Sequence, residues 1–325
     1  MSKFVKSSLI VAGVFAALGI IFCLISAIFG GRSLIYYAKN DDYIVDRIKG
    51  VGYALENFFY RIDGRHVAWM DENDNELIVN NEVVTLTVGS GAGTEKHQPI
   101  EGIRDLNLSL GAGSFVVREK DTEDGMIDIY IQGHGGCDYA KKGDTLYVEG
   151  FKGIKTIGTD LSENVITLVI PAGMGLDKVD IEVGAGVMEI VSLWANEIDA
   201  SIGAGELLID HAQIKELSAE IGAGVLEARD MDVENASLTL SMGECIYEGE
   251  LSGNLDLECD MGNMFINING HEKDFNYEIE CGAGIISIGG ASYAGLASER
   301  HINNGSSKDI EVECNMGNIE IQFKE

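Results

Sequence analysis

Residues 181–190 read IEVGAGVMEI, and this stretch returns along the chain as ASIGAGELLI from Ala200 and AEIGAGVLEA from Ala219. When the copies are aligned on the last glycine of the motif, five consecutive units follow at a constant spacing of about 19 residues. Two later units carry insertions. A fixed period of this length indicates a repeat architecture. The aligned glycines are Gly186, Gly205, Gly224, Gly243, Gly262, Gly284 and Gly317, with Gly113 as an outlying earlier member.

Apolar side chains occupy fixed positions around the aligned glycine, two residues apart, which is the period of a strand with one buried face. The alanine or methionine directly before the glycine continues this inward set, but the next inward residue follows after three positions instead of two. The sequence therefore predicts a corner at the glycine, with the residue before it facing the core. The third residue before the glycine is Val183, Ile202, Ile221, Leu240, Cys259, Cys281 or Cys314.

Each unit is thus a short strand, a glycine corner, a second strand and a return segment. One unit cannot bury its own apolar face, whereas stacked units bury a continuous core. We therefore predict an all-β fold, a parallel β-solenoid with rungs of about 19 residues that is right-handed by the crossover rule. The regular rungs cover 176–325. Residues 100–175 belong to the same domain and contain strand-like runs at Ile127–Ile131, Leu146–Glu149 and Val165–Ile170.

The glycine motifs do not indicate phosphate binding, because no GK[ST] follows them and none of them opens a helix. Cys259, Cys281, Cys314 and Cys245 fall in apolar columns, and a buried free cysteine behaves as a small hydrophobe. Cys137 lies near His134 in a predicted loop, and two ligands fall short of a zinc site. The sequence singles out no catalytic and no cofactor-binding residue.

Acidic side chains dominate the outward positions of the last three units, where they form two predicted rows. One interpretation is a solvated face that resists association. The other is weak capture of a divalent cation such as calcium, or of a cationic envelope component. The six candidate residues are Asp256, Glu258, Glu278, Glu280, Glu311 and Glu313.

The N-terminus contains an uncharged run, residues 9–29, that is long enough to cross a bilayer as a helix. We expect a tail at 1–8, an uncleaved transmembrane helix at 9–31 and a juxtamembrane segment at 32–99 with an amphipathic helix at 43–62. Basic residues lie on both sides of the span, so the positive-inside count does not fix its orientation. We place the large C-terminal domain on the extracytoplasmic side of the cell membrane.

The formal net charge of the chain is −30, and no cluster of lysines and arginines is visible. This composition argues against a nucleic-acid partner. The expected partners are the membrane, through the N-terminal span, and an unidentified envelope protein or surface ligand. The oligomeric state stays open.

The units DIEVGAGVMEI, SAEIGAGVLEA, LECDMGNMFI and VECNMGNIEI resemble the bacterial putative-adhesin family of β-strand repeat domains of unknown function, which includes LiaG-like envelope proteins. The segment VITLVIPAGMGLDKVDIEV is similar to that family's entry into its repeats. The resemblance covers roughly residues 100–325 and implies an envelope location behind one membrane span. It supplies no catalytic residues.

We therefore expect a membrane-anchored β-solenoid that acts as a non-enzymatic, adhesin-like interaction or scaffold module, linked to envelope stress. One alternative is a bactofilin-like solenoid that polymerises end to end, although the charged residues Lys324 and Glu325 at the end of the last strand argue against it. The other is a carbohydrate-active β-helix enzyme, which requires a cleft lined by carboxylates and aromatics.

Overall fold

The computed structural model describes residues 84–87, 99–121, 125–132, 136–150, 165–294 and 298–324, all within one compact unit that runs from Leu55 to Glu325. Apart from the short 3-10 helix η2 (Glu272–Asp274), the regular structure of these residues is strand, which confirms the all-β prediction. The predicted span at 9–31 and helix at 43–62 lie outside the described residues. Within the described ranges, no helix has the length and apolar character needed to cross a bilayer.

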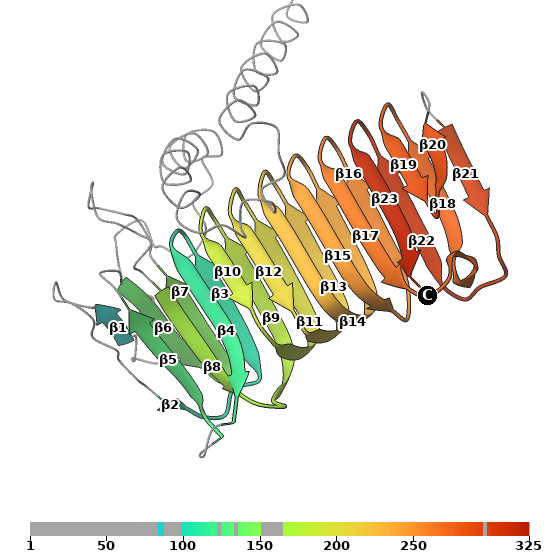
Figure 1. The fold of residues 1–325 in the computed structure, drawn as a ribbon. Helices are drawn as coiled ribbons and strands as arrows, with labels where there is room; N and C mark the ends of the chain where they lie inside the picture. The colour runs from blue at the N-terminus through green and yellow to red at the C-terminus, as the bar shows by residue number, and fades with distance from the viewer. Residues whose placement is uncertain are drawn as a thin grey trace, which may run out of the picture. The chain divides into compact units, whose positions relative to one another are not determined.

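Two rows of parallel strands form the middle of the sheet, one on each side of the glycine corners (Figure 1). The row before the corners contains β9 (Gly175–Val183), β11 (Leu193–Ile202), β13 (Ala212–Ile221), the second half of β14 (Val225–Leu240) and β16 (Leu255–Cys259). The row after the corners contains β10 (Val187–Ile190), β12 (Glu206–Asp210), the first half of β14, β15 (Glu244–Leu251) and β17 (Asn263–Asn269).

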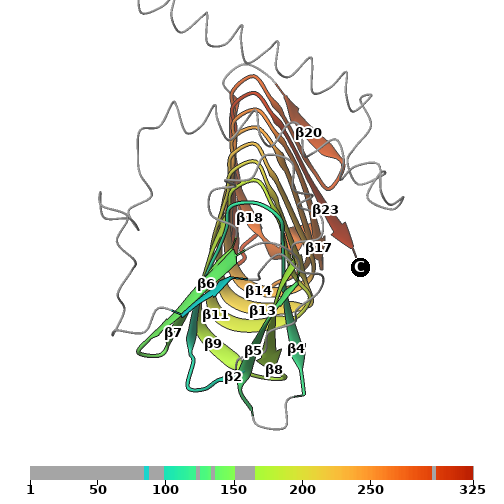
Figure 2. The same cartoon turned by 90° about the vertical axis from the view of Figure 1, so that its left-hand side faces the viewer.

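Strand neighbours in this middle part are equivalent positions of successive units. Val183 pairs with Ile202, and Ile202 pairs with Ile221, so each residue lies beside its own equivalent in the next unit. Viewed after a quarter turn, the successive corners superpose as nested arches (Figure 2). The alternation in the sequence explains this packing, since β16 reads LDLEC and buries its leucines and cysteine while its two acids face solvent.

At the N-terminal end of the stack, strands do not follow sequence order. A rung made of β3 and β4 lies between the β7–β8 rung and the β9–β10 rung, and all these pairings are parallel. The Gly113 unit therefore sits beside the Gly186 unit, although β5 to β8 lie between the two units in sequence. The strands are β3 (Asp105–Leu110), β4 (Ser114–Lys120), β7 (Thr145–Gly150) and β8 (Val165–Pro171).

Antiparallel strands close this end. β5 pairs with β8 and β6 pairs with β7, while β2 and β1 pair outside them. The run predicted at Ile127–Ile131 is β5, and the sheet already begins at Val84, before the predicted domain start at residue 100. The strands are β1 (Val84–Thr87), β2 (Pro99–Ile100), β5 (Ile127–Gln132) and β6 (Gly136–Lys142).

At the other end, the last two strands of the chain are inserted into the stack. β22 pairs with both β16 and β18, and β23 pairs with both β17 and β19. Figure 1 shows β22 and β23 between β16–β17 and β18–β21. Antiparallel β21 and β20 then pair with β18 and β19. The strands are β18 (Asn276–Cys281), β19 (Ile285–Ile288), β20 (Ala291–Ala294), β21 (Ser298–Ile302), β22 (Asp309–Cys314) and β23 (Asn318–Lys324).

The sheet is therefore mixed. The sequence period predicted a parallel stack in chain order, and that order fails at both ends, where the chain adds antiparallel strands and returns to an inner rung. A long connection between two units allows the second unit to pair with a rung other than the preceding one, because the entropic cost of loop closure rises only slowly with loop length.

The corner glycines themselves face the core, which corrects the predicted corner. Gly205 is buried, whereas exposed fractions reach 40% for Met261 and 60% for Met316, each directly before its glycine. A Cβ added to Gly205 would lie 2.5 Å from the carbonyl oxygen of Gly186 and 2.7 Å from Cγ1 of Val183. The corners of the regular rungs do not use a positive φ. Glycine is required there because the next rung approaches too closely for a side chain.

Candidate functional site

The six predicted acidic residues lie together on the outer face of three neighbouring strands. Their rung order differs from their sequence order, because β22 lies between β16 and β18. All six side chains are exposed. The register forms one row of Asp256, Glu311 and Glu278, and a second row of Glu258, Glu313 and Glu280.

Like charges in these rows affect one another. The pKa of Glu258 is raised, first by partial desolvation and then by the carboxylates of Glu313, Asp260 and Asp256. Asn315 donates from Nδ2 to Oδ1 of Asp260 at 3.0 Å and to Oε1 of Glu313 at 3.4 Å. The Asn315 amide therefore supplies hydrogen-bond donors to two carboxylates of this acidic face.

The antiparallel strand β21 extends the rows with a histidine. His301 lies opposite Glu278 in the register, with Nδ1 3.8 Å from Oε1 of Glu278 and Nε2 2.9 Å from Oε1 of Glu299. The hydrogen bond to Glu299 and the charges of Glu278 and Glu280 raise the pKa of His301 above its ordinary value. His301 is thus the cation that ends the first row when it is protonated, whereas Glu299 lies opposite Glu280 and extends the second row.

We expect NMR titration to give His301 a pKa above that of a histidine in an unfolded peptide. Glu299→Gln should lower this pKa, because it removes the strongest stabilising partner of the protonated ring. Since the folded pKa is the higher one, the His301 contacts stabilise the β18–β21 pair fully below the unfolded pKa and lose this effect as pH rises through the folded pKa. Glu311→Gln, one rung further away, is the control, and an equal shift in that variant would contradict the assignment.

The acidic rows do not close into a cage. Among the described residues, no group of three or more histidines, cysteines, aspartates or glutamates is arranged to hold a metal ion. Calcium prefers several oxygen ligands around one point, whereas these carboxylates stand in straight rows on strands about 4.8 Å apart.

The cysteines of the described residues lie in the core. Cys259, Cys314 and Cys281 are in register on adjacent strands and are buried, and the thiols of Cys259 and Cys281 donate to the carbonyls of Gly262 and Gly284 at 3.3 Å. Burial raises the pKa of Cys245 to about 12. These four therefore fill the core, as predicted.

Cys137 was expected in a loop and is instead a buried residue of strand β6, which corrects that prediction. Burial, followed by the charge of Asp138, raises the pKa of its thiol to about 12. Its sequence neighbour His134 lies outside the described residues.

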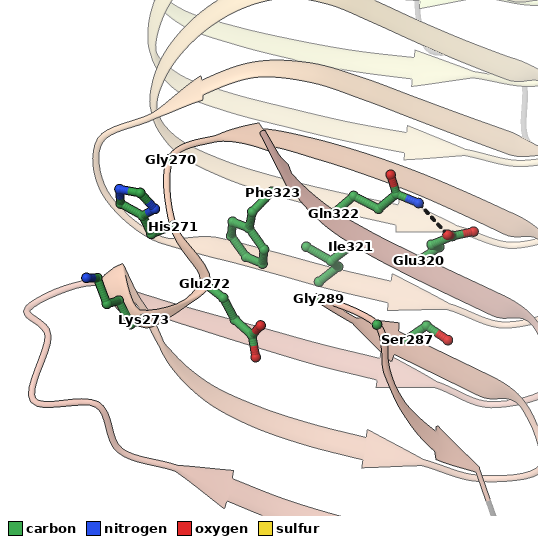
Figure 3. A pocket seen from close by; sticks show the side chains of 11 residues that line it. Gly270, His271, Glu272, Lys273, Ser287, Gly289, Glu320, Ile321, Gln322 and Phe323 are labelled. Carbon is green, nitrogen blue, oxygen red and sulfur yellow. Dashed lines mark hydrogen bonds between the residues drawn. The ribbon is translucent and has the colours of Figure 1, made fainter. Parts of the chain in front are cut away.

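A first hollow, of about 720 Å³, lies between η2 and the ends of β19 and β23 (Figure 3). The ring of Phe323 and the side chains of Glu272 and Glu320 line it, and Gln322 donates to Glu320 at 2.7 Å. Ser287 and His271 stand at opposite ends of the hollow in Figure 3, so they do not form a nucleophile–base pair. The period of the repeat does not predict this hollow, because part of its lining comes from segments outside the regular rungs, such as η2 and the residues after β19.

A second hollow, of about 480 Å³, runs across the stack on the side away from the glycine corners. Leu193, Ala212 and Met231 are buried in its floor, and Trp194 is a lining residue with 51% of its surface exposed. Its acidic residues are Glu119, Asp230, Asp232 and Glu250. We call this hollow the Trp194 groove. The carbohydrate-active alternative requires a cleft lined by carboxylates and several aromatic side chains. The described residues of the groove include the carboxylates, but Trp194 is the one large aromatic side chain among them.

None of the residues of the Trp194 groove was among the predicted site residues. Its residues recur at the period of the repeat, with Trp194, Gln213 and Asp232 on successive strands. The outward positions of the return segments repeat with the same period as those beside the glycine. That period places the indole of Trp194 in one column with the carboxylate of Asp232.

Comparison with known proteins identifies a family. The family described as Toastrack DUF4097 matches residues 103–308, more than half of the chain. No curated protein matches the chain. Solved structures that match include a "putative adhesin" from Bacteroides fragilis NCTC 9343, with 15% identity over 71% of this chain and 98% of that chain and a TM-score of 0.40.

Two further structures cover similar lengths. A "putative adhesin" from Parabacteroides merdae ATCC 43184 shares 13% identity over 72% of this chain and 97% of that chain, with a TM-score of 0.39. A "putative lipid binding protein" from Parabacteroides distasonis ATCC 8503 shares 15% identity over 73% of this chain and 98% of that chain, with a TM-score of 0.38.

Proposed function

Because the chain belongs to the Toastrack DUF4097 family, a family of domains of unknown function, we propose that it is a non-enzymatic, adhesin-like interaction module of the cell envelope. The resemblance of its repeats to a β-strand repeat family is confirmed by this match. The proposal includes a membrane anchor at residues 9–31 and a C-terminal domain on the extracytoplasmic side. It describes the stack as a right-handed parallel β-solenoid with rungs of about 19 residues.

The observation that carries the proposal is the display of six exposed carboxylates in two rows on three hydrogen-bonded strands. Neighbouring carboxylates on adjacent strands repel one another by roughly 0.8 kcal/mol per pair in water. The rows therefore reduce stability, and contact with a cationic partner would relieve that cost. The paired strands hold the charges at a fixed spacing, and a fixed charge pattern favours the recognition of a partner with a complementary pattern.

The closed ends of the stack favour a discrete module over the bactofilin-like polymer. β5 and β6 pair antiparallel with one terminal rung, and β20 and β21 pair antiparallel with the other. β21 reads SERHI, with Glu299, Arg300 and His301 exposed, and charged edge strands resist strand addition. Sedimentation of the full chain in detergent should give one discrete species, and filaments would reject this part of the proposal.

The membrane anchor and its orientation make a direct prediction. We expect the full chain, carrying a C-terminal tag, to fractionate with membranes and to lose the tag when intact cells are treated with an impermeant protease. The physical reason is that residues 9–29 form an uncharged run of bilayer length, while the remaining chain carries most of the negative charge.

A variant lacking residues 9–29 is the control and should move to the soluble fraction. A cytoplasmic marker protein must survive the protease in the same cells. A tag that is cut only after lysis would overturn the extracytoplasmic placement. The link to envelope stress is a separate part of the proposal, supported by sequence resemblance, and adjacent envelope-stress genes would support it further.

A further inference from the structure

The Trp194 groove follows a column of side chains across successive rungs. Backbone register places Trp194 next to Gln213, Gln213 next to Asp232 and Asp232 next to Glu250. These four residues thus span three strand spacings, or about 14 Å at about 4.8 Å per spacing. The column lies over the buried side chains of Leu193, Ala212 and Met231, so the groove has an apolar floor and a polar rim.

Trp194 is the unusual member of this column. Its indole is 51% exposed, and it lies beside Gly175 of the adjacent strand β9, where an added Cβ would be 4.0 Å from Cε3 of the ring. An exposed tryptophan that lines a hollow offers the strongest aromatic platform for a cation. Tryptophan is also among the residues that most often anchor protein interfaces.

Within the described residues, the carboxylates of the groove have no lysine or arginine partner. In the described part of the chain, no residue of these two types forms an ion pair with any of them. Glu119 accepts a hydrogen bond from Oγ of Ser192 at 2.7 Å, Asp232 accepts one from Nε2 of Gln213 at 3.4 Å, and Asp230 lies 3.0 Å from Nε2 of His211.

Other carboxylates on the same stack are paired with cations. Nζ of Lys178 lies 2.6 Å from oxygens of both Glu197 and Asp199, and Lys324 binds Glu248. In the described part of the chain, the carboxylates of the Trp194 groove have no such lysine partner.

We propose that the Trp194 groove binds an extended basic peptide segment of a partner protein. One lysine or arginine side chain stacks on the indole of Trp194, and further cationic side chains reach Asp232 and Glu250. An extended chain advances about 3.3 Å per residue, so a segment of about five residues covers the column. Its alternate side chains face the groove. The inference goes beyond the proposed function, which is argued from the acidic rows, because it assigns a second interaction surface and the chemistry of its partner.

The test is a fluorescence titration of the full chain in detergent micelles. The second tryptophan, Trp69, is replaced by phenylalanine so that Trp194 is the only indole. The probe is a pentapeptide with blocked ends and lysine at alternate positions. We expect a saturable change in Trp194 fluorescence, and an affinity at least about ten-fold lower for the same peptide with acetylated lysines, which lack the charge.

Variants of the protein distinguish binding of the peptide at the Trp194 groove from general attraction of a basic peptide to an acidic protein. Asp232→Asn combined with Glu250→Gln should weaken binding about ten-fold, and Trp194→Ala, followed by calorimetry, should weaken it by a similar factor. Asp256→Asn combined with Glu258→Gln makes the same charge change on the acidic rows and should alter the affinity less than about two-fold.

Equal losses in the two carboxylate variants would overturn the proposal, because binding would then follow net charge alone. Saturable binding of a chitin tetrasaccharide in place of the peptide would also overturn it and would make the groove a carbohydrate site. No saturable change with either probe would remove the groove as a binding site. The titration does not depend on membrane orientation, so a tag protected in intact cells would reject the location and leave the groove intact.

Discussion

A chain that ends at Ser307 is expected to lose the fold of its whole C-terminal end, and not only the last two strands. The truncation removes β22 and β23, which lie between β16–β17 and β18–β19. It also removes five buried apolar residues: Ile310, Val312, Cys314, Ile319 and Ile321. At about 1.5–3 kcal/mol for each buried side chain, this loss is comparable with the total stability of an ordinary domain.

Hydrogen exchange measures this prediction strand by strand. Residues 276–281 of β18 should lose protection together with residues 255–259 of β16, because each strand loses β22, one of its two neighbours. A chain lacking only Glu325 is the control and should keep full protection. If β18 stayed protected in the truncated chain, the strands would be stacked in sequence order and β22 would be a terminal strand.

The second large effect is expected at a corner glycine. A Cβ added to Gly243 would lie 1.8 Å from the carbonyl oxygen of Gly224, which is backbone and cannot rotate away. Gly243→Ala must therefore push two rungs apart. We expect it to destabilise the fold by about 3 kcal/mol or more, with a fall of roughly 10 °C in the midpoint of thermal unfolding.

Gly175→Ala is the matched control. Gly175 has no positive φ, and the nearest atom to an added Cβ is Cε3 of Trp194 at 4.0 Å. This variant should stay within about 0.5 kcal/mol of the parent, or gain slightly because alanine restricts the unfolded chain. If circular dichroism gave both variants the same midpoint, close packing at the corners would not be the reason for the glycines.

Part of the candidate site was visible in the sequence. The acidic rows follow from the two-residue alternation, because a residue between two buried neighbours on a strand must face solvent. The sequence did not show that Glu311 and Glu313 lie between the acids of β16 and those of β18. It also did not show that His301 lies opposite Glu278. Both features depend on which strands become neighbours. The first hollow also depends on inserted segments, which no period describes.

The sequence by itself determined which strand residues face the core and where each rung turns, because burial alternates locally along a strand and the corner glycines recur at a constant interval. Only the tertiary structure decided the order of the rungs and the direction in which Gly243 and its equivalents face. Every rung offers the same hydrogen-bonding edges and apolar columns, so periodicity cannot choose between neighbours.

Specific contacts make that choice. The backbone N–H of Asp309 donates to Oδ1 of Asn254 at 3.0 Å, and Nδ2 of Asn315 donates to Oδ1 of Asp260 at the same distance, which ties β22 to both ends of β16. These polar contacts join residues 55 positions apart. They form only after the chain has folded back, and for that reason the tertiary structure, and not the repeat, sets the final arrangement.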